Sequence, residues 1–289
     1  MGFEHDAFVY SDDDDFLDQA APFLHRGLTA GETVVAALPE LRNDLLRGAL
    51  GRRADQVIYV DIADVGRNPA RIIPLWRALL DQAPGIPLRG LGEPAYPGRS
   101  AAELDEAILN ELLLNVAFGR ARSFRLRCPY SAKVDADPAG LHPSTDATRA
   151  AAATTFCTPL SPVPLGAVRM PFGLADLGEI RQTLEAQARP RGLDGDRLDD
   201  LTLALHEICT NSIRFGGGRG RLSLWAEGGM LVCDVADHGR IDDLLVGRVL
   251  PPTDRLGGRG VWMANQLCDL VQVRSGGSGT QVRLHAVLR

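Results

Sequence analysis

Short apolar runs alternate with longer helical patterns from residue 5 to about residue 135. The apolar runs predict buried strands, and the segments between them repeat their apolar residues at helical spacing. The predicted strands are Thr33–Leu38, Val57–Val60, Pro87–Leu91 and Phe124–Leu126, and the predicted helices are Pro39–Leu50, about Pro69–Ala83 and a helix that continues through Asn115. Because strands that alternate with helices form βαβ units, we predict an α/β domain over residues 3–135 with a mainly parallel sheet.

Residues 136–163 break this pattern. They contain prolines and a run of alanines, at Pro138, Pro143, Pro159, Pro162 and 150–153. This composition favours an inter-domain linker. A short helix over the alanine run is the alternative, because alanine is the strongest helix former.

The order of elements changes in residues 164–289. A strand at about Gly166–Met170 precedes two successive helices, at about Leu174–Ala188 and Asp196–Phe215. The later elements are strands at Arg221–Trp225 and Met230–Asp237, a glycine-rich loop with a helix that ends at Cys268, and two final strands. Helices followed by mostly adjacent strands are typical of an α+β two-layer sandwich, which we predict for this second domain.

The composition is that of a globular protein and limits its partners. The chain has 289 residues, 45% of them hydrophobic, and a net charge of −6. That length suits two domains of about 100–200 residues each. The negative charge argues against direct binding to nucleic acid or to anionic membranes, and no run of about 18 apolar residues predicts a membrane span.

Lysine is almost missing from the basic residues. Only one of the 31 basic residues, Lys133, is a lysine. A P-loop places its lysine after a glycine-rich loop, whereas Lys133 follows Ser131-Ala132. The count therefore excludes a Walker-type ATPase and disfavours Schiff-base chemistry. Because alanine and glycine are also abundant, we attribute most of the arginine to codon use in a GC-rich genome.

The cysteines give no sign of a metal or disulfide framework. They are scattered and form no Cys-x-x-Cys pair, at Cys128, Cys157, Cys209, Cys233 and Cys268. We therefore expect buried reduced thiols rather than a zinc site or disulfides. The acidic segment Met1–Asp6 has no signal-peptide pattern, and we expect a cytoplasmic protein.

One predicted helix of the second domain combines an apolar back with two polar side chains. Glu207 and Asn211 are four residues apart and share one helical face, and an apolar stripe lies roughly opposite, at Leu201, Leu205 and Ile208. A glutamate suits a general base, and an asparagine oxygen suits Mg²⁺. Alone the pair says little, because Glu111 and Asn115 repeat the spacing and polar helix faces are usually solvated.

Three glycine-containing motifs follow that helix. Asp237 leaves an apolar strand and is followed by Gly239, where the backbone can approach a ligand closely. The sequence Gly257-Gly258-Arg259-Gly260 opens a helical pattern, and free N–H groups at a helix start favour phosphate. Gly279-Thr280 begins the last strand. Each motif alone is typical of an ordinary turn or loop, but their order and spacing together are more specific.

In this order the motifs resemble the GHKL ATPase fold of gyrase, histidine kinases and MutL. Residues 164–289 most resemble the anti-sigma-factor serine kinases of bacteria. The resemblance implies ATP and Mg²⁺ as cofactors, Glu207 as the catalytic base and Asn211 as the ligand that holds Mg²⁺ on the phosphates. It also implies that Asp237 binds the adenine amino group, that Gly239 lies beneath the base, that Thr280 lies near the adenine, and that the phosphates are lined by Gly257, Gly258 and Gly260.

The aspartate box departs from the family pattern. Ile241 stands where a second glycine is usual, and Arg240 precedes it. Arg240 could reach a phosphate, or the altered box could weaken nucleotide binding; we expect binding to be retained. Arg240 and Arg259 flank the two glycine boxes and are the arginines that codon use explains least. His206 lies on a different helical face from Glu207, and we expect a core or surface histidine there rather than a phosphoacceptor.

The first domain resembles the MEDS sensory domain, a RecA-like α/β module proposed to sense small organic molecules. The resemblance covers residues 3–135 and rests on His5-Asp6, Tyr10, the segment Gly92–Ser100 and the segment Glu111–Phe118. RecA-like folds normally carry a P-loop, and this one has none, which favours ligand sensing or protein docking. Candidate pocket residues are His5, Tyr10, Glu93, Arg99, Glu111 and Asn115, of which Glu111 and Asn115 could equally form a helix face pinned to a neighbouring loop. The run Asp12–Asp15 is expected to be a solvated helix start rather than a metal site.

These expectations combine into a bacterial regulatory switch. The sensor domain would be coupled to an ATP-binding serine/threonine kinase domain of the anti-sigma type, which controls a sigma factor or phosphorylates its anti-anti-sigma antagonist. We expect a homodimer. The alternatives are a non-catalytic ATP-binding module whose nucleotide state only shapes partner binding, and a histidine kinase-like component.

Overall fold

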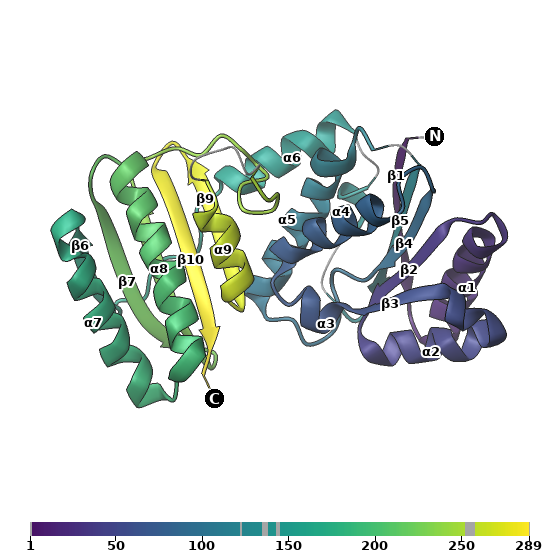
Figure 1. The fold of residues 1–289 in the computed structure, drawn as a ribbon, viewed down its shortest axis with the longest axis horizontal. Coiled ribbons are helices and arrows are strands. Elements are labelled where there is room, and N and C mark those ends of the chain that lie inside the picture. The colour runs from purple at the N-terminus through teal and green to yellow at the C-terminus, as the bar shows by residue number, and fades with distance from the viewer. Residues whose placement is uncertain (1, 122, 135–137, 143–144, 252–257, 289) are drawn as a thin grey trace. The chain divides into compact units, whose positions relative to one another are not determined.

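The structure is a computed structural model that describes all residues except 1, 122, 135–137, 143–144, 252–257 and 289. The chain divides into two compact units, Met1–Ala152 and Ala153–Arg289 (Figure 1). Among the described helices, none is long and apolar enough to cross a membrane. All five cysteines are free thiols; four are buried, and Cys157 is exposed, contrary to the expectation for that residue.

The first unit is a parallel five-stranded sheet between two layers of helices. Its order is β1-β5-β4-β2-β3, and every described strand pair is parallel. Helices α1 and α2 cover one face and α3, α4 and α5 cover the other (Figure 1). The elements are β1 (Phe3–Tyr10), α1 (Asp13–Thr29), β2 (Thr33–Leu38), α2 (Glu40–Leu50), β3 (Val57–Asp61), α3 (Ile62–Val65), α4 (Ile72–Gln82), β4 (Leu88–Gly92), α5 (Ala101–Phe118) and β5 (Phe124–Ser131).

Local sequence accounts for most of these elements. Residues 34–38 of β2 are all buried, as expected of an apolar strand in the interior of a parallel sheet. Helix α1 begins after Asp12, whose side chain accepts a hydrogen bond from the Asp15 N–H, so the predicted helix start is confirmed. Helix α5 begins with a capping box between Ser100 and Glu103. The apolar pattern did not predict β1, because polar side chains alternate along this edge strand.

The segment 136–163, predicted as a linker, contains regular structure. A 3₁₀ turn covers Pro138–Gly140, and helix α6 covers Asp146–Cys157. The alanine run therefore forms a helix, the alternative considered above, because the prolines lie outside the run and alanine favours helix. The division between the two units falls inside α6.

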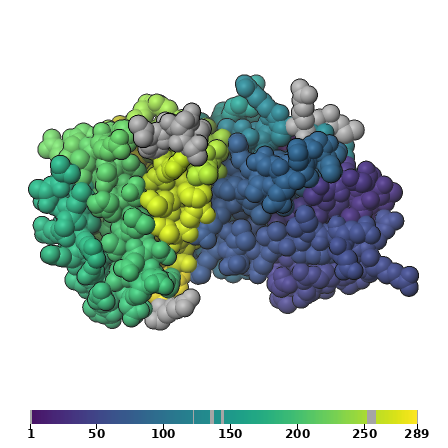
Figure 2. Space-filling view, in the orientation of Figure 1, coloured from purple at the N-terminus to yellow at the C-terminus, as the bar shows by residue number. Residues whose placement is uncertain are grey.

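The second unit is a two-layer sandwich. Its sheet has the order β6-β7-β8-β10-β9 with antiparallel neighbours, and α7, α8 and α9 lie on one face, where they form much of the surface seen in Figure 2. The elements are β6 (Val168–Phe172), α7 (Leu177–Ala188), α8 (Gly195–Phe215), β7 (Gly220–Glu227), β8 (Met230–Asp237), α9 (Gly260–Leu267), β9 (Leu270–Gly276) and β10 (Gly279–Val287). The predicted fold class, mixed α/β with a parallel sheet followed by a separate two-layer sandwich, is confirmed.

Close packing of α4 on the first sheet depends on a glycine in β4. A Cβ atom on Gly90 would lie 2.8 Å from ring atoms of Trp76, whose side chain is buried. We expect Gly90→Ala to displace the indole and to lower the free energy of unfolding by about 1–3 kcal/mol. Gly48, in helix α2, is the matched control, since a Cβ atom added there would have no atom of the described residues within 4 Å. Gly48→Ala should be neutral or stabilising by up to about 1 kcal/mol. Denaturant unfolding measures both, and equal stabilities would contradict this account of the packing.

Candidate functional site

Helix α8 presents Glu207 and Asn211 together on a partly exposed face. The opposite face is buried in the core of the second unit through Leu201, Leu205 and Ile208. This burial fixes the rotation of the helix about its axis. The pair is therefore held in place by the packing on the other side of α8, as the sequence pattern predicted.

The start of α9 lies directly against this pair. A Cβ atom on Gly260 would lie 2.9 Å from Glu207 Oε2 and 2.9 Å from Asn211 Nδ2. Heavy atoms that are not hydrogen-bonded do not approach so closely, so a larger residue at this position would have to push both side chains away. The absence of a side chain at Gly260 thus lets the first turn of α9 and the polar face of α8 meet.

Asp237 ends strand β8 with both carboxylate oxygens engaged. Its Oδ2 accepts a hydrogen bond of 2.5 Å from the Ser212 hydroxyl, and its Oδ1 accepts one of 2.7 Å from the Gly239 N–H. Each carboxylate oxygen has two lone pairs, so one more donor can be accepted at each. A Cβ atom on Gly239 would lie 2.7 Å from the Phe215 carbonyl oxygen, which explains why glycine is needed there.

Thr280 is held beside Asp237 by the pairing of β10 with β8. The two residues are opposite each other in the antiparallel register, and the Thr280 hydroxyl donates a 3.0 Å hydrogen bond to the Gly239 carbonyl oxygen. The Ser275 hydroxyl lies 2.9 Å from that of Thr280 and accepts a hydrogen bond from the Ile241 N–H. Ser212 and Ser275 were not predicted, because a single serine beside a motif carries no distinctive spacing.

These residues border a cavity of about 530 Å³. Its lining includes Asn211, Asp237, Gly239, Gly258 and Thr280. The structure therefore brings the predicted residues together, with two qualifications. Glu207 and Gly260 are not part of the lining, although Gly260 lies directly against both Glu207 and Asn211. Gly257 lies outside the described residues.

The departure at position 241 gives the cavity an apolar wall. Ile241 lines the cavity and packs against the core cluster of the second unit. Arg240 is exposed, and its guanidinium donates a 2.6 Å hydrogen bond to Asp242. Arg259 precedes the first residue of α9 and is exposed. His206 is also exposed, as expected of a surface histidine.

In the first unit, Tyr10 and Glu93 form a buried pair at the carboxyl ends of β1 and β4. The Tyr10 hydroxyl donates a 2.5 Å hydrogen bond to Glu93 Oε1, while the buried Glu93 Oε2 has no hydrogen-bond partner among the described residues. Burial raises the pKa of Glu93 to about 7, and the hydrogen bond from Tyr10 and the charge of Arg42 offset it only in part. Tyr10 and Arg42 line a cavity of about 520 Å³. This is the edge at which open parallel sheets bind ligands.

The other candidates of the first unit lie elsewhere. Arg99 donates to the backbone carbonyl oxygens of Gly66, Arg67 and Pro94, so it pins loops together. His5, Glu111 and Asn115 meet in the space between β1, β5 and α5. Both Glu111 and Asn115 are buried, and the amide of Asn115 donates a hydrogen bond to the Leu141 carbonyl oxygen, so this helix face is pinned to a neighbouring loop, as the alternative interpretation had it.

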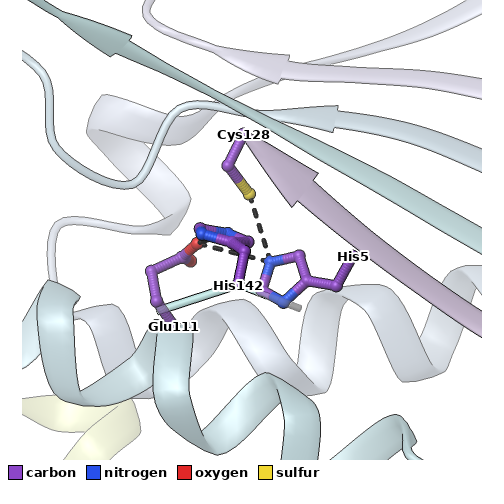
Figure 3. Close-up of side chains that lie close together, drawn as sticks. All are labelled: His5, Glu111, Cys128 and His142. Atoms are coloured by element: carbon purple, nitrogen blue, oxygen red, sulfur yellow. Dashed lines mark hydrogen bonds and ion pairs between the residues drawn. The ribbon is translucent and has the colours of Figure 1, made fainter. Parts of the chain in front are cut away.

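Cys128 and His142, which the sequence did not predict, complete this second group (Figure 3). Burial alone would raise the pKa of Glu111, but hydrogen bonds and charges from His142 and His5 outweigh it and lower the pKa to about 2. Burial lowers the pKa of His142, but the hydrogen bond and charge of Glu111 raise it overall. Burial and the charge of Glu111 raise the pKa of the Cys128 thiol well above its usual value.

Comparisons with known families agree with this division. Residues 4–143 match the model of the MEDS family, the methanogen/methylotroph DcmR sensory domain, and residues 170–286 match the model of the histidine kinase-like ATPase domain. The chain thus carries a MEDS domain at its N-terminal end and a histidine kinase-like ATPase domain at its C-terminal end.

One solved structure with a similar region is that of the RsbU and RsbW domains of a protein from Mycobacterium tuberculosis. The similarity covers 44% of this chain and 33% of that chain, at 18% identity and a TM-score of 0.33. The chain therefore aligns with about a third of the length of that protein. No curated protein matches the chain.

Glu93 makes the stability of the first unit depend on pH. The pKa of Glu93 is about 7 in the folded chain, whereas the ordinary value of 4.5 applies to the unfolded chain. The folded state therefore binds the proton of this carboxyl group more tightly than the unfolded state does. The resulting stabilisation is fully present below pH 4.5 and is lost as pH rises to about 7. It amounts to about 3 kcal/mol, at roughly 1.4 kcal/mol for each pKa unit.

Urea unfolding of the wild type and of Glu93→Gln at several pH values measures this effect. Because the glutamine does not titrate, the stability of the wild type relative to the variant should fall by about 3 kcal/mol across this interval. A difference between the two proteins that stays constant with pH would show that Glu93 ionises normally in the folded chain.

Proposed function

We propose that the histidine kinase-like ATPase domain binds ATP with Mg²⁺ and transfers the terminal phosphoryl group to a serine or threonine of a regulatory partner protein. The observation that supports the proposal most strongly is that Gly260 lies against Glu207 and Asn211 at the edge of a cavity that is lined by Asn211 and Asp237. A histidine kinase-like ATPase domain implies ATP binding in general. The serine or threonine acceptor and the roles of single residues are our proposal.

The donor set of the cavity fits a nucleotide base at one end. Asp237 is fixed by Ser212 and by the Gly239 N–H and retains lone pairs that can accept the exocyclic amine of adenine. Gly239 leaves room for the flat ring beside it, and Thr280 supplies a hydroxyl at the same end. The apolar side chains of Ile241 and Val246 also line the cavity and suit an aromatic base.

The other end fits the phosphates. Asn211 offers a neutral oxygen of the kind that Mg²⁺ accepts, and Gly258 and Gly260 bring backbone N–H groups to the start of α9, where the helix dipole favours anions. When bound, Mg²⁺ supplies positive charge that neutralises the phosphate oxygens. Arg259 lies at the same helix start and is the arginine that we assign to this end, while Arg240 pairs with Asp242.

Glu207 is the residue that we assign as general base. In this role its carboxylate would accept the proton of the attacking hydroxyl while the oxygen of that hydroxyl forms a bond to the terminal phosphorus. The bond between that phosphorus and the bridging oxygen would break at the same time, and ADP would leave. Phosphoryl transfer needs little beyond such positioning and charge neutralisation.

The regulatory part of the proposal concerns the partners. An anti-sigma role would make the phosphoacceptor an anti-anti-sigma protein and the sequestered protein a sigma factor. The MEDS domain would bind a small organic molecule in the cavity lined by Tyr10, Arg42 and Ser131. A homodimer and a cytoplasmic location stay predictions. The alternatives remain a non-catalytic nucleotide-dependent binding module and a histidine kinase-like component.

Two substitutions separate the binding of nucleotide from the transfer step. With labelled ATP, Mg²⁺ and a candidate antagonist protein, we expect wild type to form phosphoserine or phosphothreonine. Glu207→Gln should retain nucleotide affinity and reduce transfer by about 100-fold or more, since a general base contributes about 10²–10⁴-fold. Asn211→Ala should weaken Mg-ATP binding by about 10- to 100-fold, because a hydrogen bond or ligand to a charged group is lost.

His206→Ala is the matched control, because His206 adjoins Glu207 in sequence but lies on another exposed face of α8. Both activities should be unchanged in this variant. Binding of ATP without transfer to any antagonist would favour the non-catalytic module. Acid-labile label on the protein itself would instead favour histidine chemistry.

A further inference from the structure

Four side chains with metal-binding atoms converge in the core of the MEDS domain (Figure 3). They come from separate elements: His5 from β1, Glu111 from α5, Cys128 from β5, and His142 from the segment between the 3₁₀ turn at Pro138–Gly140 and α6. One donor atom of each lies within 4.8 Å of the others. The group is distinct from the Tyr10–Glu93 pair, which lies at the carboxyl ends of the strands.

Hydrogen bonds outside the group fix which ring nitrogen of His5 faces inward. The amide nitrogen of Asn115 donates to the carbonyl oxygens of Leu141 and Glu111, so the amide oxygen of Asn115 must be the atom that faces His5. That oxygen lies 2.9 Å from His5 Nδ1, which therefore carries a hydrogen and donates it. In the neutral ring the lone pair is then on Nε2, the atom that faces Cys128 and Glu111.

The same argument applies to His142. Its Nδ1 lies 3.2 Å from the Pro138 carbonyl oxygen, which can only accept, so this nitrogen carries the hydrogen. Nε2 of the neutral ring then directs its lone pair at Glu111 Oε2, 3.3 Å away. Metal-bound histidines are usually oriented in this way, by an acceptor on the nitrogen that does not bind the metal.

Three of the six separations within the group match the edges of a tetrahedron around a small ion, and the other three are no longer than 4.8 Å. Glu111 Oε2 lies 3.3 Å from His142 Nε2 and 3.5 Å from His5 Nε2, and Cys128 Sγ lies 3.4 Å from His5 Nε2. Tetrahedral zinc with bonds of about 2.0–2.3 Å has ligand-to-ligand distances of about 3.3–3.6 Å. Tyr130 donates a 3.4 Å hydrogen bond to Glu111 Oε2 and so also helps to orient the carboxylate.

We propose that His5, Glu111, Cys128 and His142 form a structural Zn²⁺ site in the MEDS domain. Imidazole, carboxylate and thiolate are the ligands that zinc takes in proteins, and four of them leave no open position for a substrate. Binding releases the proton of the Cys128 thiol, together with any second proton that the His5 or His142 ring carries at the pH of the experiment. The two negative ligands then balance the charge of the ion, so the buried site is neutral overall, which removes the cost of burying an unpaired charge.

The site would determine the position of the segment that leads out of the domain. Its other three ligands belong to the sheet and to α5, whereas His142 follows a short turn, and its side chain is the least buried of the four. A zinc ion would therefore hold residues 138–142 against β1 and β5. Without the ion, the contacts that still hold this segment include the hydrogen bond between Asn115 and Leu141 and the contacts of His142 with Glu111, His5 and Tyr130.

Titration with Co²⁺ tests the proposal in the full-length chain, stripped with a chelator and kept free of nucleotide so that the second domain has no metal–nucleotide complex to bind. We expect one Co²⁺ per chain, the visible bands of a tetrahedral ion and a thiolate-to-cobalt charge-transfer band, all removed by one equivalent of Zn²⁺. Cys128→Ser should lose the charge-transfer band and bind Zn²⁺ about tenfold or more weakly. Cys157→Ser is the control, because Cys157 is exposed and lies outside the group, and its spectrum should equal that of wild type.

His142→Ala provides an independent variant if Cys128→Ser does not fold. His142 lies on a connecting segment, so of the four positions it should tolerate substitution with the smallest loss of stability. It too should bind Zn²⁺ at least about tenfold more weakly, and Zn²⁺ should no longer slow hydrogen exchange at residues 138–142. Absence of stoichiometric Co²⁺ and Zn²⁺ binding to the wild type would overturn the proposal and leave a protonated His–Glu–His cluster. Cobalt spectra that are identical in Cys128→Ser and Cys157→Ser would overturn it as well.

Discussion

Helices α8 and α9 approach each other so closely at Gly260 that nothing larger than the hydrogen in place of its side chain fits between the backbone of α9 and the side chains of Glu207 and Asn211. The rest of the candidate nucleotide site depends on this contact. The apolar back of α8 packs against the antiparallel sheet and sets the direction in which the pair points. The same sheet places Asp237 at the end of β8 and Thr280 opposite it on β10. A carboxylate, an amide and a helix start therefore face one cavity although they come from distant parts of the chain.

The sequence predicted the parts of the molecule that depend on local patterns. The apolar strands, the acidic start of α1 and the amphipathic α8 follow from periodicity and capping, and the structure has them close to the predicted positions. Strand β1 was missed because it is an edge strand in which His5 and Asp6 interrupt the apolar pattern. Its extended conformation is stabilised by pairing with β5, which lies more than 100 residues later in the sequence. The roles of Ser212 and Ser275 could not be predicted either, because they depend on tertiary packing. The contact of α8 with β8 brings the Ser212 hydroxyl to Asp237, and the pairing of β9 with β10 brings the Ser275 hydroxyl to Thr280.

The two Glu-x-x-x-Asn pairs show how little a spacing determines by itself. Glu207 and Asn211 keep partial exposure, and Asn211 lines a cavity in which a ligand can reach it. Glu111 and Asn115 have the same spacing but are buried under the parallel sheet, where the carboxylate faces two histidines and the amide orients one of them. The first pair was identified by the glycine motifs that follow it. The second needed the fold, because Cys128 and His142 join it from a strand and a connecting segment.

If the contact of Gly260 with Glu207 and Asn211 forms a nucleotide site, a side chain at position 260 should weaken the binding of Mg-ATP, which calorimetric titration of Gly260→Ala measures. The wild type should bind one nucleotide per chain, and the added methyl group should weaken binding by about tenfold or more, since it displaces side chains by steric overlap that costs about 1–3 kcal/mol. Gly178→Ala, in α7 with no atom within 4 Å of the new methyl group, should bind like the wild type. Wild-type protein that binds no Mg-ATP, or a Gly260→Ala variant that binds it with unchanged affinity, would show that this contact is not part of a nucleotide site.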